Sequence, residues 1–207
     1  MTPRVWARVV LATRNPGKAR ELHALFTSIG VTLEDLDAAG LGAVDAAEET
    51  LESYPTFEEN ARAKARWFAA RLPGCLVIAD DSGLEVDALG GSPGVHSKRW
   101  SGSTAEGAAL EAANNVALQR ALEGKATRSA RYVSVVVATD GTREYVARGE
   151  CRGRILDAAE GTNGFGYDPF FFSDDLGESF GSASREEKSA VSHRGRAFRA
   201  LVEQLVA

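Results

Sequence analysis

CLVIADDSG, residues 75–83, consists of five apolar residues followed by two acids, a serine and a glycine. The apolar run predicts a buried β-strand, and we expect this strand to end at Asp80 and Asp81. Paired carboxylates at the end of a buried strand suit a divalent cation, because hard cations prefer oxygen ligands. An isolated pair of aspartates more often just ends a strand at the surface. The other motifs of the chain therefore decide whether these acids are functional.

Helical and strand patterns alternate in the first half of the chain. Residues 9–12 read as another buried strand. The following helix shows one apolar face at positions i, i+3, i+4 and i+7, formed by Leu22, Leu25, Phe26 and Ile29. Thr56 and Glu59 form a capping box that predicts a helix from residue 56 to about residue 71.

A hairpin dominates the second half of the chain. Ser103 and Glu106 predict a capping box and a helix that ends near residue 122. Two strand patterns then flank Asp140-Gly141, which is a strong signal for a two-residue turn. Ser192 is expected to cap the last helix. Alternating elements followed by a hairpin predict an α/β fold with a mixed central sheet flanked by helices, in a single domain of residues 1–207 that could have two lobes.

Charge and hydropathy exclude several classes of protein. The 207-residue chain has a formal net charge of −5, which argues against general binding to nucleic acid. It contains no run of roughly 18 apolar residues, so no membrane span is expected, and its first residues lack a secretory pattern. Cys75 and Cys151 lie in strand-like segments and are expected to be buried, reduced thiols. Cytoplasmic localisation is the resulting expectation.

A first candidate phosphate site is the pattern Thr13-x-Asn15-x-x-Lys18, at a strand-to-helix junction. Amide groups at a helix N-terminus favour phosphate, and these side chains could add donors and a positive charge. The glycine spacing of a Walker loop is absent. The alternative is a helix start with a solvated lysine.

A second cation, Lys64, lies four residues after Asn60, so both are expected on one helical face. Such a pair is more often a solvated helix surface. An additional acid for a metal could come from Glu48, Glu49 or Glu52 in residues 37–55, which show no periodicity and are expected to form a mobile loop.

Two later motifs suit a planar ligand. The glycine-rich loop of residues 161–168 contains Phe165, which could stack on a base, although a tight turn feeding a core strand explains the loop nearly as well. Lys188, His193 and Arg194 could donate to the carbonyl oxygen of a base or to phosphate, or simply cap a helix. No histidine shows the spacing of a zinc site.

Taken together and in this order, these blocks resemble the inosine/xanthosine triphosphate pyrophosphatase family, which removes nonstandard purine nucleotides. The matching segments span nearly the whole chain: residues 13–18, 56–61 with Lys64, 79–87, 91–102, 161–169, 187–189 and 192–195. The resemblance implies a long mixed sheet with a cleft between two lobes, and usually a homodimer. It also implies Mg²⁺-dependent hydrolysis of ITP, dITP and XTP to the monophosphate and pyrophosphate.

The resemblance further implies a role for each matching residue. Asp81 would be the general base and a metal ligand, with Glu52 as the second metal ligand. The implied substrate-binding residues are Thr13, Asn15, Lys18, Lys64, Ser82, Phe165, Gly166, Tyr167, Asp168, Lys188, His193 and Arg194. Spacing to the capping box favours Glu52 as the metal ligand, whereas matching the Glu-Glu-Thr string selects Glu49. Arg14 departs from the glycine usual in the family, and would either crowd the phosphate loop or add a charge to it.

The bare residues are consistent with this chemistry. Attack at the α-phosphorus requires charge to be spread over several oxygens, which a metal ion and lysines would do. Two other functions use the same groups. One is a metal-dependent phosphatase that releases orthophosphate from nucleotides or sugar phosphates, and the other is a non-catalytic nucleotide sensor.

Overall fold

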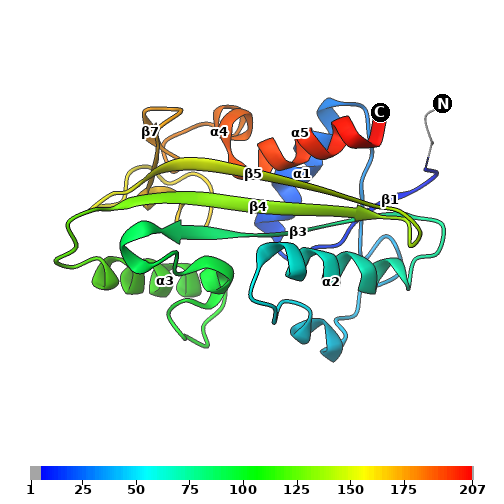
Figure 1. Ribbon diagram of the computed structural model, residues 1–207, viewed down its shortest axis with the longest axis horizontal. Coiled ribbons are helices and arrows are strands. Elements are labelled where there is room, and N and C mark those ends of the chain that lie inside the picture. Colours follow the sequence, from blue (N-terminus) through cyan, green and yellow to red (C-terminus); the bar gives the residue numbers. More distant parts are fainter. Residues whose placement is uncertain (1–5, 207) are drawn as a thin grey trace. The chain divides into compact units, whose positions relative to one another are not determined.

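The structure is a computed structural model that describes residues 6–206, except for the side chain of Glu49. Within that range, seven strands form one sheet in the order β2-β1-β3-β4-β5-β6-β7 (Figure 1). The strands are β1 Val9–Leu11, β2 Glu34–Asp35, β3 Leu76–Val86, β4 Ser129–Thr139, β5 Glu144–Ile155, β6 Phe171–Ser173 and β7 Glu178–Ser179. β1 is parallel to β2 and β3, whereas β6 is antiparallel to β5 and β7. The predicted mixed α/β fold is therefore confirmed.

The chain divides into two compact units. The first comprises Met1–Asp81, Ser134–Gly149 and Gly195–Ala207, and the second comprises Ser82–Val133 and Glu150–Arg194. β3, β4 and β5 each run from one unit into the other. The single functional domain and the cleft stay predictions.

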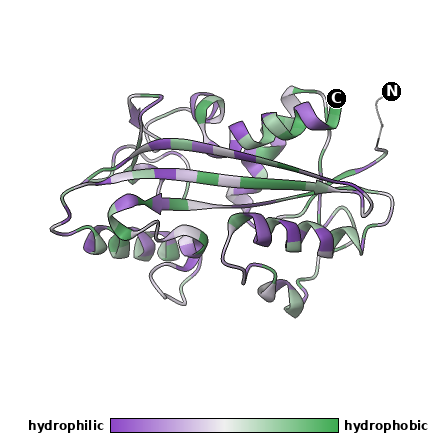
Figure 2. Cartoon of the chain, in the orientation of Figure 1, coloured by the Kyte–Doolittle hydropathy of each residue, from purple (hydrophilic) through white to green (hydrophobic). Residues whose placement is uncertain are grey.

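In the first unit, helices cover both faces of the strands. Figure 1 shows α1 (Pro16–Ser28) and α5 (His193–Val206) on one face and α2 (Phe57–Ala69) on the other. Phe26 of α1 packs edge to face on Phe198 of α5, with ring centroids 5.5 Å apart. The apolar residues of β4 near its C-terminal end are fully or almost fully buried here, and Figure 2 shows this part of the strand as continuously hydrophobic. Of the predicted helical face, Leu22 and Phe26 belong to this core and Leu25 packs against it, whereas Ile29 is exposed.

The second unit contains α3 (Gly107–Ala121), α4 (Arg185–Val191) and the short 3₁₀ turns η2 (Asp87–Leu89), η3 (Gly94–Arg99) and η4 (Asp168–Phe170). Leu118 and Leu122, at the end of α3, pack in its core with strand residues such as Leu84. Phe171 and Phe180 both pack on Tyr132, with ring centroids at 4.7 and 5.9 Å. This aromatic cluster anchors the segment that precedes α4.

The prediction that the strand ends at the acids is wrong. β3 continues through Asp80 and Asp81 to Val86, and both aspartates lie inside it. β1 pairs with β3 only as far as Ile78, while β4 stays its neighbour on the other side. Pairing with β4 thus overrides the low strand propensity of these residues. The acids lie instead where the neighbouring strand β1 has ended.

The second capping box is also wrong. α3 begins at Gly107 with Glu106 as its N-cap residue and without a side-chain capping bond. Ser103 instead accepts a hydrogen bond from the amide of Ala105, a local turn that competes with helix capping. A capping box that the prediction did not use, Ser184 with Glu187, starts α4.

The turn between β4 and β5 differs from the prediction, and the predicted loop of residues 37–55 contains one short element. Four residues, Asp140 to Arg143, join β4 to β5 in place of a two-residue turn, and the Asp140 carboxylate accepts from the amides of Thr142 and Arg143. The loop of residues 37–55 contains a 3₁₀ turn, η1 (Ala46–Thr50), with a complete capping box between Asp45 and Glu48.

Candidate active site

The first unit holds the predicted phosphate loop. Asn15 is the N-cap residue of α1, and its side-chain oxygen accepts from the amides of Gly17 and Lys18 at 2.8 and 3.2 Å. The Thr13 hydroxyl accepts from the amide of Asn15. These bonds hold the start of α1 in place and orient the positive end of its dipole. The Asn15 Nδ2 group remains a donor that is not used in capping.

The two adjacent aspartates have different partners. Asp80 is completely buried and its carboxylate lies 3.1 Å from Nζ of Lys18 on α1. Asp81 is 6% exposed and accepts a hydrogen bond of 2.9 Å from Nδ2 of Asn60 on α2. Successive side chains of a strand point to opposite faces, which agrees with the positions of α1 and α2 on opposite faces of the sheet (Figure 1). Asp80 therefore orients Lys18, whereas Asp81 is the acid held by a neutral donor.

Lys64 is buried on α2, one turn after Asn60, and its Nζ lies 2.5 Å from Oε1 of Glu52. Burial opposes the charge on this lysine, but Glu52, Asp80 and Asp81 outweigh burial and raise its pKa. Lys64 is consequently a fixed positive charge among three carboxylates.

Asp81 has a raised pKa. Burial is the main cause, and the positive charges of Lys18 and Lys64 oppose it, while Glu52 adds to the upward shift. A carboxylate with a raised pKa takes up a proton more readily than an ordinary aspartate. These features fit the predicted general base.

The acids present fit a hard cation. Among residues 6–206, no group of three or more His, Cys, Asp or Glu side chains forms a protein-only metal site. Mg²⁺ is commonly held by one or two carboxylates, with waters and substrate phosphates completing its shell. Asp81 and Glu52, which both interact electrostatically with Lys64, supply that number. The competing ligand Glu49 lies outside the described side chains.

The second unit holds the predicted base-binding residues. Asp168 and Lys188 form a buried ion pair at 2.5 Å, and the same Asp168 oxygen accepts from the amide of Phe165 at 2.8 Å. An added Cβ at Gly164 would lie 2.1 Å from this oxygen, so glycine is required there. Asp168 thus holds the glycine-rich loop and Lys188 together.

Phe165 lies close to two cations. Nζ of Lys188 is 5.0 Å and the guanidinium carbon of Arg194 is 5.7 Å from the centroid of its ring. Arg194 also donates to the Ser82 hydroxyl at 2.9 Å. The structure therefore brings Ser82, Phe165, Lys188 and Arg194 together.

The side chains of His193 and Tyr167 have different kinds of partner. The His193 ring stacks on Tyr132 with centroids 4.6 Å apart and an angle of 10° between the planes. The Tyr167 hydroxyl donates to the Ser97 carbonyl at 2.8 Å, and burial raises its pKa. The Gly166 carbonyl accepts from Nδ2 of Asn115. Substrate contacts by Gly166 and Tyr167 stay predictions.

A family model described as the Ham1 family matches residues 9–204 of the chain. The chain belongs to the Ham1 family. A relative from Ralstonia nicotianae, named dITP/XTP pyrophosphatase, is 45% identical over 201 residues, covering 96% of each chain. A relative from Caldanaerobacter subterraneus with the same name is 40% identical over 202 residues, again covering 96% of each chain. The family predicted from the motifs is confirmed.

Solved structures agree with this membership. The HAM1 protein from Coxiella burnetii matches with a TM-score of 0.80 and 31% identity, over 96% of this chain and 98% of that chain. A nucleoside-triphosphatase / dITP/XTP pyrophosphatase from Mycobacterium abscessus matches with a TM-score of 0.70 and 38% identity, over 96% and 99%. None of the helices described in this Ham1-family protein is long and apolar enough to cross a membrane.

In this Ham1-family protein the sequence prediction gave no site role to several residues that contact predicted site residues, among them Asn60 and Tyr132. Asn60 was noticed only for its spacing to Lys64, yet it is fully buried and bonds Asp81. Tyr132, which supports His193, had no local signal because an aromatic residue in an apolar strand reads as core. The omission in both cases concerns a partner far away in sequence.

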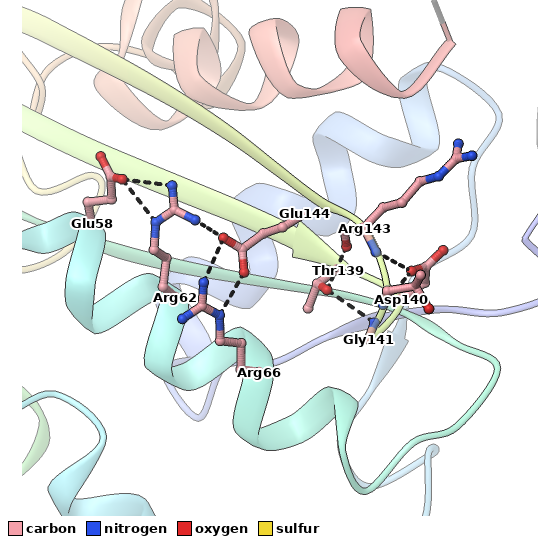
Figure 3. Close-up of polar contacts among 9 residues, drawn as sticks. Glu58, Arg62, Arg66, Thr139, Asp140, Gly141, Arg143 and Glu144 are labelled. Atoms are coloured by element: carbon pink, nitrogen blue, oxygen red, sulfur yellow. Dashed lines mark hydrogen bonds and ion pairs between the residues drawn. The ribbon is translucent and has the colours of Figure 1, made fainter.

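A separate depression of about 410 Å³ lies at the β4–β5 turn of the Ham1-family chain. Its lining includes Arg66, Thr139, Arg143 and Glu144. Figure 3 shows Glu144 between Arg62 and Arg66, while the Arg143 side chain points away from them. None of the predicted site residues lines this depression, so it is not the candidate active site.

Proposed function

We propose that this Ham1-family protein hydrolyses the nonstandard purine nucleoside triphosphates ITP, dITP and XTP to the monophosphate and pyrophosphate, in a Mg²⁺-dependent reaction. The curated relatives carry the name dITP/XTP pyrophosphatase at 40% and 45% identity over nearly their whole length. The observation that carries the proposal is Asp81, a buried carboxylate held by Asn60 and influenced by Lys18, Lys64 and Glu52. Such hydrolysis would clear these nucleotides from the pool.

The triphosphate is assigned to the residues around the start of α1 and to Lys64 of α2. Lys18 and Lys64 supply positive charge, and the N-terminus of α1 supplies the favourable end of the helix dipole. Thr13 and Asn15, which shape this N-terminus, add side-chain donors. These groups spread the charge that develops on the leaving pyrophosphate.

Glu52 and Asp81 are assigned to Mg²⁺, which when bound would neutralise phosphate charge and lower the pKa of a water molecule. Asp81 then accepts a proton from the attacking water. The water oxygen forms a bond to the α-phosphorus as the bond from that phosphorus to the pyrophosphate oxygen breaks. Asn60 keeps the Asp81 carboxylate in one orientation during this transfer.

The base is assigned to four residues that the sequence predicted, Phe165, Lys188, His193 and Arg194. Phe165 offers a face for stacking, while Lys188, His193 and Arg194 offer donors for the O6 atom of a 6-keto purine. Asp168 orients Lys188, and Ser82 orients Arg194. Adenine carries an amino group at this position and would leave these donors unpaired, at a cost of roughly 1–3 kcal/mol each.

Product analysis tests this function. Purified protein with Mg²⁺ and a panel of purine triphosphates is expected to release monophosphate and pyrophosphate from ITP, dITP and XTP, with slow turnover of ATP. Release of orthophosphate would favour the phosphatase alternative. Binding of intact triphosphate without turnover would indicate a sensor.

The proposal extends to the state of the protein in the cell. We infer that the single-domain chain acts as a homodimer in the cytoplasm, where free nucleotides are found. Light scattering of the purified protein tests the dimer, and a mass of one chain of 22.0 kDa would contradict it.

A further inference from the structure

Arg14 interacts with residues 41–48, which we call the acidic segment. It makes no described contact with the neighbouring helix α1. Its guanidinium donates to both carboxylate oxygens of Glu48, at 3.0 Å from Nε and 2.9 Å from Nη2. It also donates to the carbonyl oxygens of Leu41, Gly42 and Ala43, at 2.8, 3.2 and 3.2 Å. Only the planar fork of an arginine can make this set of bonds, because a lysine lacks the paired donors.

Residues 42–47 bury little of their own surface. All six are exposed. Glu48 stabilises the turn that follows, because its carboxylate also accepts from the amide of Asp45 to complete the capping box of η1. A segment without buried apolar side chains depends on such polar contacts for its conformation. The hydrogen bonds of Arg14 and Glu48 are therefore the main described contacts that hold residues 42–47 on the first unit.

The same segment leads to the proposed metal ligand. The amide of Leu51 donates to the carbonyl of Glu48 at 3.2 Å, so the turn continues directly to Glu52. The Glu52 side chain is 46% exposed and reaches Nζ of Lys64. A shift of η1 would consequently move Glu52 relative to Lys64.

We propose that Arg14 is a positioning residue, which clamps residues 41–48 and thereby presents Glu52 for metal binding beside Lys64. This inference rests on the proposed function for the role of Glu52. Arg14 lies between Thr13 and Asn15, so the clamp also connects the phosphate loop to the acidic segment. The charge of Arg14 thus acts on the protein and not on the triphosphate.

Amide hydrogen exchange and Mg²⁺ dependence test the clamp in Arg14→Ala. Protection of the amides of residues 41–52 is expected to fall, while protection elsewhere in the unit stays as in the wild type. The Mg²⁺ concentration for half-maximal turnover is expected to rise roughly tenfold, the lower end of what loss of a ligand-supporting contact costs. Arg14→Lys keeps the charge and loses the fork, and it should resemble Arg14→Ala in both measurements.

Arg8→Ala is the matched control. Arg8 also forms a forked pair with a glutamate, donating from Nε and Nη2 to Glu34 at 2.9 and 2.6 Å. It makes no contact with residues 41–52 among the interactions described. Its replacement should leave the exchange of that segment and the Mg²⁺ dependence unchanged.

Two results would overturn the clamp. One is unchanged exchange in residues 41–52 of Arg14→Ala. The other is a higher KM for the triphosphate at an unchanged Mg²⁺ requirement, which would place Arg14 on the phosphates. If Arg14→Ala does not fold, Glu48→Gln tests the clamp in its place. This variant keeps the arginine and weakens the forked pair, so residues 41–52 should lose protection, but less than is expected for Arg14→Ala. If the wild-type protein released no pyrophosphate, the proposed function would be contradicted. The comparison of amide exchange would still test the clamp.

Discussion

Asp81 combines two properties at the scale of a single residue. It is buried in the middle of a strand, which raises its pKa, and it is held by Asn60 in one orientation. Asp80 beside it is paired with Lys18. Adjacent residues with the same chemistry therefore have different partners, and the proposed role of each can be tested separately.

Asp81→Asn is expected to reduce kcat at least about 10³-fold, because general-base catalysis contributes roughly 10²–10⁴-fold and a metal ligand is lost as well. Nucleotide should still bind, since the cation contacts remain. Single-turnover kinetics and equilibrium binding of ITP measure the two effects. Near-normal turnover would remove Asp81 from this role.

Lys18→Ala is expected to raise the KM for ITP substantially, by about tenfold or more, because one charge on the triphosphate is lost. It also leaves Asp80 buried without this cation, which lowers stability by about 3–5 kcal/mol. The double variant Lys18→Ala/Asp80→Asn should recover much of the melting temperature but not the KM. An unchanged KM in either variant would place Lys18 away from the triphosphate.

Glu48 predicts a pH dependence of stability. Its hydrogen bond with Arg14 is the main cause that lowers its pKa below the ordinary value of 4.5. The folded state thus favours the charged form, so this stabilisation is present above pH 4.5 and is lost as the pH falls through the lower folded pKa. Wild-type protein should lose more free energy of unfolding than Glu48→Gln over that acidic window. Urea unfolding at stepped pH measures both free energies of unfolding. An equal decrease with pH in the two proteins would contradict the assignment.

At the scale of an element, α2 connects the proposed site to the sheet. Asn60 and Lys64 lie on its buried face, whereas Arg62 and Arg66 extend to Glu144 of β5. Figure 3 shows Glu144 placed between both guanidinium groups. The position of the two site residues therefore depends partly on an ion-pair network outside the site.

Glu144→Ala is expected to lower the free energy of unfolding by about 1–2 kcal/mol, because two charge-assisted pairs are lost at a mostly buried carboxylate. Glu58→Ala is the control, since Glu58 is half exposed and pairs with Arg62 within the helix. Its cost should stay below about 0.5 kcal/mol. Equal costs in urea unfolding would mean that Glu144 does not anchor α2.

At the scale of the whole molecule, the two compact units are continuous through three strands. β3, β4 and β5 each begin in one unit and end in the other. A strand cannot lose its conformation in one unit without disturbing the backbone that enters the other. We therefore expect one cooperative unfolding transition for the chain.

Single-tryptophan variants test this expectation. Trp67 reports on the first unit and Trp100 on the second. Variants that keep only one of these tryptophans should give fluorescence transitions in urea that coincide with each other and with circular dichroism. Two separate midpoints would mean that the units unfold independently and that the single-domain prediction is wrong.

The local elements of this protein were predictable from its sequence alone. The apolar spacing of Leu22 and Phe26, the cap at Thr56 and the apolar run before Asp80 act over a few residues, so they are visible without the fold. The family followed from the order of its motifs, and the match over residues 9–204 confirms it. The box at Ser184 and Glu187 was equally readable and was overlooked.

The tertiary structure alone decided which distant side chains meet. Asn60 and Asp81 are 21 residues apart, and Arg14 and Glu48 are 34 apart, so the topology of the chain sets both contacts and local propensity does not. The tertiary structure also decided that β3 continues through Asp80 and Asp81, because pairing with β4 outweighs the preference of these aspartates for a turn. Short-range periodicity depends on neighbours within about one helical turn, whereas these contacts require a folded sheet to bring its helices and loops into place.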